Sequence, residues 1–159
     1  MDVNIRHASN EDLTKVHKLI GELAAYEEAP HEVTLDEATF KKDFQSGHKP
    51  YFNILVAEFE QTIVGFALYF FTYSTWKGRC LYLEDFYVKA NHRRKRIGQA
   101  LFEAILTIAK EEAVKRLAWQ VLEWNEPAIE FYKQYNAELD PEWINGRLRE
   151  NQIEAAKTR

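Results

Sequence analysis

Two adjacent carboxylates interrupt an otherwise apolar segment, Leu83-Glu84-Asp85-Phe86-Tyr87-Val88. Carboxylates are rarely buried unless they are paired with a cation or used in a reaction. Because successive strand residues face opposite sides, we do not expect Glu84 and Asp85 to reach one ligand through the same face. From this segment alone two interpretations stay open: a functional site, or a strand end whose carboxylates are capped by arginine or by backbone N–H groups.

A basic turn, Arg93-Arg94-Lys95-Arg96-Ile97-Gly98, follows this segment and leads into an amphipathic helical pattern. The N-terminus of a helix offers unpaired backbone N–H groups and the positive end of the helix dipole, which together with cationic side chains suit a pyrophosphate. Four basic residues in isolation would be more typical of a solvated loop or a nucleic-acid contact. Their position at a strand–loop–helix junction favours the phosphates of a nucleotide.

A third pattern, Asn125-Glu126-Pro127, is typical of a helix start, and Tyr132 lies in the helix that would follow. Tyr132 could take part in catalysis. The commoner role of such a tyrosine is structural, with the ring half-buried and the hydroxyl bonded at the core edge. The pattern alone does not decide between these roles.

These residues need a framework, and the periodicity of the chain predicts a mixed α+β fold with one largely antiparallel central sheet flanked by helices. A first helix is expected after Ser9 and Asp12, and a capping box of Thr34 and Glu37 predicts a second, short one before Gly47. Amphipathic spacing predicts another after Gly98. We expect strands at 2–8, 52–58, 62–73, 80–88, 117–122 and 146–151, and a short helix at 128–135.

Size and charge narrow the function classes. The chain has 159 residues, of which 46% are apolar, and its formal net charge is −4. This size suits one core, and there is no repeat or linker, so we expect a single domain over residues 1–159. The negative balance disfavours bulk nucleic-acid binding and mildly favours a cationic partner.

Cysteine, histidine and hydropathy patterns add further expectations. Cys80 is the only cysteine, which excludes an intrachain disulfide and makes a reducing cytoplasm the simplest setting. No stretch approaches the ~20 apolar residues of a membrane span, so we expect no membrane partner. The five histidines lack metal-ligand spacing, and no metal is expected.

Together the motifs resemble a known family. The Arg-x-x-x-x-Gly turn after a strand, followed by a helix and by Asn-x-Pro-x-x-x-x-Tyr, resembles the GNAT superfamily of N-acetyltransferases over nearly the whole chain. The runs around Leu83–Val88 and Trp124–Tyr132 are similar to the spermidine/spermine N-acetyltransferase subfamily. Within it, Ser74-Thr75-Trp76-Lys77-Gly78-Arg79 most resembles the diamine acetyltransferase branch associated with thialysine, and Leu23-Ala24-Ala25-Tyr26-Glu27 adds a match on the substrate side.

This resemblance implies an activity and its partners. It implies a GNAT-type fold and acetyl-CoA as co-substrate, with direct transfer of the acetyl group to a primary amine of a small cationic molecule. That molecule would be a polyamine, a diamine or a thialysine-like amino acid. The resemblance also implies a homodimer. Two alternatives stay open: a protein lysine or N-terminal acetyltransferase, and a non-catalytic acyl-CoA-binding module, against which the presence of Tyr132 and Glu84 counts.

The resemblance also assigns roles to single residues. Tyr132 would protonate the departing thiolate, and Glu84 would accept the proton of the amine through water. The substrate-binding side chains would be Tyr26, Glu27, Glu84 and Trp76, although Trp76 could instead be a loop anchor. Backbone and side-chain groups for the cofactor would come from Phe86, Tyr87, Val88, Arg94, Lys95, Arg96, Ile97, Gly98, Gln99, Asn125 and Pro127.

One position departs from the family pattern. Arg96 stands where the family usually has the first glycine of its pyrophosphate loop. If a positive φ is required there, arginine is disfavoured because its Cβ clashes with the backbone. Its guanidinium would nevertheless add a fork of phosphate donors.

Overall fold

The computed structural model describes residues 3–45 and 50–156, in two compact units, Met1–Gln120 and Val121–Arg159. The second unit contains α4 (Glu126–Lys133) and α5 (Glu150–Ala155). The first unit contains β1 (Val3–His7), η1 (Asn10–Asp12), α1 (Leu13–Tyr26), η2 (Pro30–Glu32), α2 (Glu37–Phe44), β2 (Asn53–Phe59), β3 (Thr62–Ser74), β4 (Gly78–Val88), η3 (Ala90–His92), α3 (Ile97–Glu111) and β5 (Leu117–Ala118).

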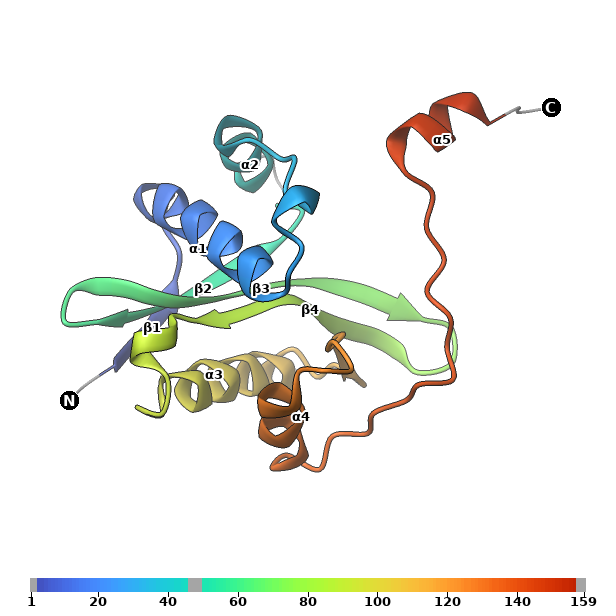
Figure 1. The fold of residues 1–159 in the computed structure, drawn as a ribbon. Coiled ribbons are helices and arrows are strands. Elements are labelled where there is room, and N and C mark those ends of the chain that lie inside the picture. Colours follow the sequence, from blue (N-terminus) through green and yellow to red (C-terminus); the bar gives the residue numbers. More distant parts are fainter. Residues whose placement is uncertain (1–2, 46–49, 157–159) are drawn as a thin grey trace. The chain divides into compact units, whose positions relative to one another are not determined.

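The first unit is built on a five-stranded sheet in the order β1-β2-β3-β4-β5. The first four strands pair antiparallel, and β5 pairs parallel to β4. Figure 1 shows α1 and α2 on one face of the sheet and α3 on the other. The predicted mixed, largely antiparallel sheet with flanking helices is confirmed, including the meander of β2, β3 and β4.

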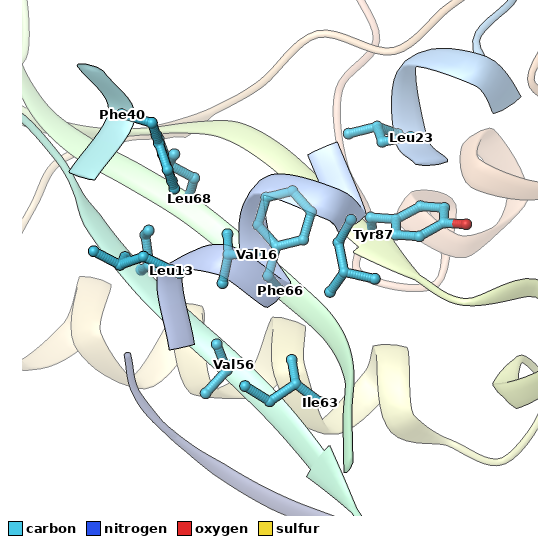
Figure 2. Packing of buried hydrophobic residues seen from close by; sticks show 11 residues of the cluster. Leu13, Val16, Leu23, Phe40, Val56, Ile63, Phe66, Leu68 and Tyr87 are labelled. Atoms are coloured by element: carbon cyan, nitrogen blue, oxygen red, sulfur yellow. The ribbon is translucent and has the colours of Figure 1, made fainter. Parts of the chain in front are cut away.

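The core between α1 and the sheet explains why α1 forms where it does. Leu13, Val16 and Leu23 recur at helical spacing and are buried. They pack against side chains of the strands, among them Val56, Phe66 and Leu68 (Figure 2). Burying side chains of this size contributes roughly 1.5–3 kcal/mol each, so this face fixes α1 firmly on the sheet.

A bulge in β4 changes the direction of its carboxylates. Leu83 pairs with Tyr69 and Asp85 pairs with Leu68, which leaves Glu84 as the extra residue of β4. Tyr82 pairs with Phe70, so Tyr82 and Asp85 face the same side although they are three residues apart. The prediction of strict alternation through this segment is therefore wrong.

Two predicted boundaries are also wrong. The second short helix begins at Glu37 and not in a capping box of Thr34, because the Thr39 N–H donates to Asp36 Oδ1 at 2.7 Å. An aspartate at the N-cap satisfies a helix donor as well as a threonine does, and spacing alone could not choose between them. The strand expected at 117–122 is only Leu117–Ala118, paired with Leu81 and Tyr82.

The last predicted strand, at 146–151, is not found. Residues 150–155 form the helix α5 instead, and the Arg149 N–H donates to the Gln152 side chain at 2.8 Å. A glutamine at the third helical position capping the residue before the helix is a local helix-start signal. It outweighs the weak strand pattern, whose apolar residue Leu148 is exposed.

Candidate active site

Two carboxylates of the first unit, Glu84 in β4 and Glu27 just after α1, act electrostatically on a third, Asp85, at the β4 bulge. Burial raises the pKa of Asp85 to about 7, and the negative charges of Glu84 and Glu27 add to the increase. Partial burial also raises the pKa of Glu27. Among the described residues none of the three forms an ion pair. We call Glu27, Glu84 and Asp85 the acidic cluster.

The end of α1 positions Glu27 within this cluster. The Ala29 N–H donates to Ala24 O at 2.9 Å and the Glu28 N–H to Ala25 O at 3.2 Å, a pattern that ends a helix when the residue beyond it is left-handed. Glu28 has a φ of 61°, as this motif requires. Carboxylates at a helix C-terminus oppose the helix dipole, so Glu27 does not serve the stability of α1.

The basic turn after β4 adopts the conformation that its sequence disfavours. Arg94 and Arg96 have φ values of 62° and 61°, and Arg96 is the residue from which α3 begins. The departure noted at Arg96 therefore does not prevent a positive φ there. Left-handed backbone costs a non-glycine residue roughly 1–2 kcal/mol, a strain that persists where the surroundings hold it and that is typical of functional sites.

The side chains around this turn leave its outer surface cationic. Arg94, Lys95 and Arg96 are exposed, and Lys95 Nζ lies 5.0 Å from the centre of the Phe59 ring. A Cβ built on Gly98 would lie 3.9 Å from both Phe86 and Val88, which is ordinary contact. Packing within the chain therefore does not require glycine at 98, whereas close approach of a ligand to the first turn of α3 would.

The end of β4, between the acidic cluster and the basic turn, is anchored by side chains that alternate between the two faces of the sheet. Phe86 packs edge-on against Phe102 of α3, with ring centres 5.8 Å apart, while Tyr87 belongs to the core on the α1 side. In the described part of the chain, β5 pairs with β4 only at Leu81 and Tyr82. The remainder of that β4 edge, which includes Phe86, Tyr87 and Val88, faces no strand of the sheet.

The second unit contains the remaining predicted residues. Asn125 is the N-cap of α4, and its Oδ1 accepts the Ala128 N–H at 3.3 Å, with Pro127 in the first helical turn. Tyr132 is buried, and its ring lies 5.4 Å from that of Phe131. The predicted short helix is confirmed, but it begins and ends two residues earlier than the expected range 128–135.

Comparison with known proteins identifies the family. The Acetyltransferase (GNAT) family matches residues 15–136. The chain belongs to this family. It is 37% identical over 144 residues to thialysine N-epsilon-acetyltransferase of Bos taurus, a match that covers 86% of this chain and 84% of that protein. It is 35% identical over 140 residues to human spermidine/spermine N(1)-acetyltransferase-like protein 1, covering 84% of this chain and 20% of that protein.

Solved structures agree on the fold. An integron cassette protein from the mobile metagenome of V. cholerae has a TM-score of 0.76 and 26% identity, covering 97% of this chain and 96% of that one. An aminoglycoside acetyltransferase from an uncultured soil metagenomic sample has a TM-score of 0.76 and 23% identity, covering 92% and 97%. The chain is thus an N-acetyltransferase with the fold and subfamily resemblance expected from its sequence, and acetyl-CoA is the co-substrate of its family.

Trp76 of this acetyltransferase is not brought to the acidic cluster within one chain. It lies at the tip of the β3–β4 hairpin and is 82% exposed. Its N–H and that of Lys77 donate to Ser74 Oγ at 3.3 and 3.2 Å, which shapes the turn through the backbone. Five strand residues lie between Gly78 and Glu84, and the six steps along the strand span roughly 20 Å.

Sequence reasoning left two residues of the first unit without a role. Asp85 was visible as a carboxylate in an apolar run, but its burial beside Glu84 and Glu27 depends on the bulge. Arg93 was visible only as part of the basic turn, and it contacts Tyr26 and Tyr87. In the described ranges, no group of three or more His, Cys, Asp or Glu could hold a metal ion. Nor is any helix there long and apolar enough to cross a membrane.

Proposed function

We propose that this acetyltransferase transfers the acetyl group of acetyl-CoA to a primary amine of a small cationic molecule, namely a polyamine, a diamine or a thialysine-like amino acid. The observation that carries this proposal is the acidic cluster, for which the described residues supply no ion-pair partner and two of whose members lie on the strand that leads into the cationic turn. A cation suits the first feature and a pyrophosphate suits the second. The activities in the names of its relatives support the same substrate class.

The residues of the turn fit the phosphates of acetyl-CoA. Arg94, Lys95 and Arg96 would supply charge, and the backbone of Ile97, Gly98 and Gln99 would supply N–H donors at the start of α3. The edge of β4 at Phe86, Tyr87 and Val88 would bond the pantetheine arm, and Asn125 and Pro127 would line the cofactor groove. Acetyl-CoA, as a substrate, supplies the activated acetyl thioester.

The acidic cluster would bind and deprotonate the amine. An alkyl amine with a pKa of ~10 is almost wholly protonated at neutral pH and must lose a proton before it attacks a carbonyl. Glu84 and Glu27 would attract the cation, because both side chains still reach solvent. Asp85, whose pKa is raised to about 7, suits proton acceptance near neutral pH. We therefore propose Asp85 as the base, in place of Glu84 acting through water.

Tyr132 would complete the transfer as the acid. As the N–C bond forms and the C–S bond breaks, the phenol would donate its proton to the departing sulfur, and the proton of the amine would go to the acidic cluster. The position of Tyr132 in the helix that Asn125 and Pro127 begin matches the motif that the family resemblance assigns to this role. Tyr26 is proposed as a further contact of the substrate, whereas Trp76 lies at the far end of β4 and would not contact the same small substrate within one chain.

The test is thiol release from acetyl-CoA with spermidine, spermine, putrescine, thialysine, lysine and a lysine peptide, for wild type and Tyr132→Phe. We expect turnover on a small amine that falls about 10²-fold or more in the variant. Binding of acetyl-CoA without turnover on any small amine would reject the proposal. Turnover on the peptide alone would indicate a protein acetyltransferase, and turnover on none of the acceptors would favour a binding module.

We also propose a homodimer in a reducing cytoplasm. Large apolar side chains are exposed on the second unit, and exposed apolar groups of this size are typical of interaction sites; they are Leu139, Trp143, Ile144, Leu148 and Ile153. Cys80 is buried and free, which suits a reducing compartment. Light scattering coupled to size exclusion would measure the mass, and a monomer at micromolar concentration would reject the dimer.

A further inference from the structure

Arg93, the first residue of the basic turn, contacts α1. Its Nε donates to Val88 O at 3.0 Å, at the end of β4. Its guanidinium carbon lies 4.5 Å from the centre of the Tyr26 ring and 5.6 Å from that of Tyr87. A guanidinium at these distances is attracted to the faces of aromatic rings. Arg93 therefore joins the end of β4 to the last residue of α1.

A second link runs beside the first. The Tyr87 hydroxyl donates to Glu22 Oε2 at 3.3 Å, and Lys89 Nζ lies 3.4 Å from Glu22 Oε1. Glu22 is one turn before Tyr26 on α1, so the last turn of the helix is bound to β4 at two levels. Tyr26 and Glu27, which end the helix, are the residues proposed to receive the substrate.

Arg93 is also adjacent to the strained part of the turn. Arg94 follows it directly with a φ of 62°, and Arg96 has a φ of 61°. Such backbone is held only when the flanking structure determines it. On the C-terminal side the turn is held by the first turn of α3. On the N-terminal side it is held by Arg93, which contacts Val88 and Tyr26. We therefore expect a ligand that contacts the turn to restrict Arg93 as well.

We propose that Arg93 is a positioning residue that couples the two sites, so that CoA bound at the basic turn orders the last turn of α1 and tightens binding of the amine. The inference rests on the proposed function for its substrates. Couplings between two sites typically change affinity by about 5- to 150-fold, and they are reciprocal for binding. Because Arg93 keeps much of its surface in solvent, we expect the low end, about five- to tenfold.

Hydrogen exchange with CoA alone tests the coupling without any turnover or any knowledge of the amine. In wild type, saturating CoA should slow amide exchange both in residues 94–99 and in residues 22–29. In Arg93→Gln the slowing at 94–99 should remain and the slowing at 22–29 should be lost. Tyr26→Leu, which removes the ring and leaves Arg93 in place, should give the same result.

Arg79 offers a matched control. Its guanidinium lies 4.0 Å from the centre of the Phe71 ring and pairs with Glu112, so Arg79→Gln removes the same kind of contacts on another part of the sheet. This variant should keep the exchange response of the wild type at both segments. Equal protection of residues 22–29 in wild type and Arg93→Gln would overturn the proposal, as would a wild type in which CoA protects only the turn.

Steady-state kinetics give a second, independent measurement. With saturating acetyl-CoA and the best amine of the panel, Arg93→Gln should raise the KM of the amine about five- to tenfold and change kcat less than about twofold. Arg93→Lys, which keeps the charge over the rings, should recover part of this loss. A variant that changes only the KM of acetyl-CoA would make Arg93 a phosphate ligand and overturn the proposal.

The exchange and kinetic experiments also separate this inference from the proposed function. Coupled protection by CoA without transfer to any amine would reject the proposed function and keep the coupling. Transfer to a small amine, with CoA protecting residues 94–99 but not residues 22–29, would keep the proposed function and reject the coupling. Failure of CoA to bind at all would reject both.

Discussion

Two buried or partly buried aspartates of the first unit have opposite electrostatic environments. Arg6 donates to Asp12 through Nη1 at 2.6 Å and Nη2 at 3.1 Å, and the Ser9 N–H donates to it at 2.7 Å. The hydrogen bond from Arg6, followed by the smaller effect of Ser9, lowers the pKa of Asp12 to about 2 despite burial. Asp85 has no such cation, and burial beside Glu84 and Glu27 raises its pKa to about 7.

The difference separates a structural carboxylate from an available one. Asp12 has a fixed cationic partner, Arg6 of β1. Its charge is therefore already neutralised, and it stabilises the start of α1. Among the described residues Asp85 has no cationic partner, so its ionised form carries a free-energy cost in the folded protein that a cationic ligand would relieve. An amine bound there would supply the charge that Arg6 supplies to Asp12.

The largest expected effect is on catalysis. Asp85→Asn should lower kcat/KM for the amine by about 10²- to 10³-fold, because the amide cannot accept the proton. Circular dichroism should show an unchanged fold. Asp12→Asn is the control and should keep kcat under conditions where it is folded. If Glu84→Gln causes the larger loss and Asp85→Asn a small one, Glu84 is the base after all.

The next effect is on stability. Asp12→Asn should lower the free energy of unfolding by about 2 kcal/mol at pH 7, since each unit of pKa shift corresponds to roughly 1.4 kcal/mol. The folded pKa lies below the unfolded one, so this stability is present above the unfolded pKa of 3.8 and is lost as pH falls through about 2. Urea unfolding from pH 2 to 7 would measure it. No change at pH 7 would mean that the pair with Arg6 contributes nothing.

A smaller effect has the opposite sign at Asp85. Its folded pKa of about 7 lies above the unfolded 3.8, so between these values the folded state binds more protons and stability falls as pH rises. Asp85→Asn removes this dependence. From pH 5 to 8 the variant should gain on the order of 1 kcal/mol relative to wild type, allowing for solvent near the site. If urea unfolding gives the same difference in free energy between variant and wild type at pH 5 and at pH 8, the raised pKa is contradicted.

The smallest effect comes from the edge of the acidic cluster. Glu27→Gln removes one negative neighbour and should lower the pKa of Asp85 by about half a unit, since Glu27 is the lesser of the two charges. The acidic limb of the pH profile of kcat/KM should shift to lower pH by the same amount. Glu28→Gln is the matched control, one residue further along the chain. An equal shift in both variants would reflect general charge and not the cluster.

Local patterns in the sequence were sufficient for the frame of the molecule. Helical spacing of Leu13, Val16 and Leu23 predicts α1, and β-branched and aromatic runs with short turns predict the meander of β2, β3 and β4. Residues Ser9 and Asp12, and Asn125 with Pro127, mark helix starts because capping involves only near neighbours. The same local reasoning failed where competing signals were weak, as at Thr34 and at 146–151.

The sequence by itself determined the order of the elements and the positions of the acidic pair and the basic turn, because each depends on neighbours along the chain. Only the tertiary structure decided how they act. Strand pairing created the bulge at Glu84, packing raised the pKa of Asp85, and contacts with Tyr26 and Tyr87 directed Arg93 toward α1. These features depend on residues distant in the sequence, whose proximity no local pattern encodes.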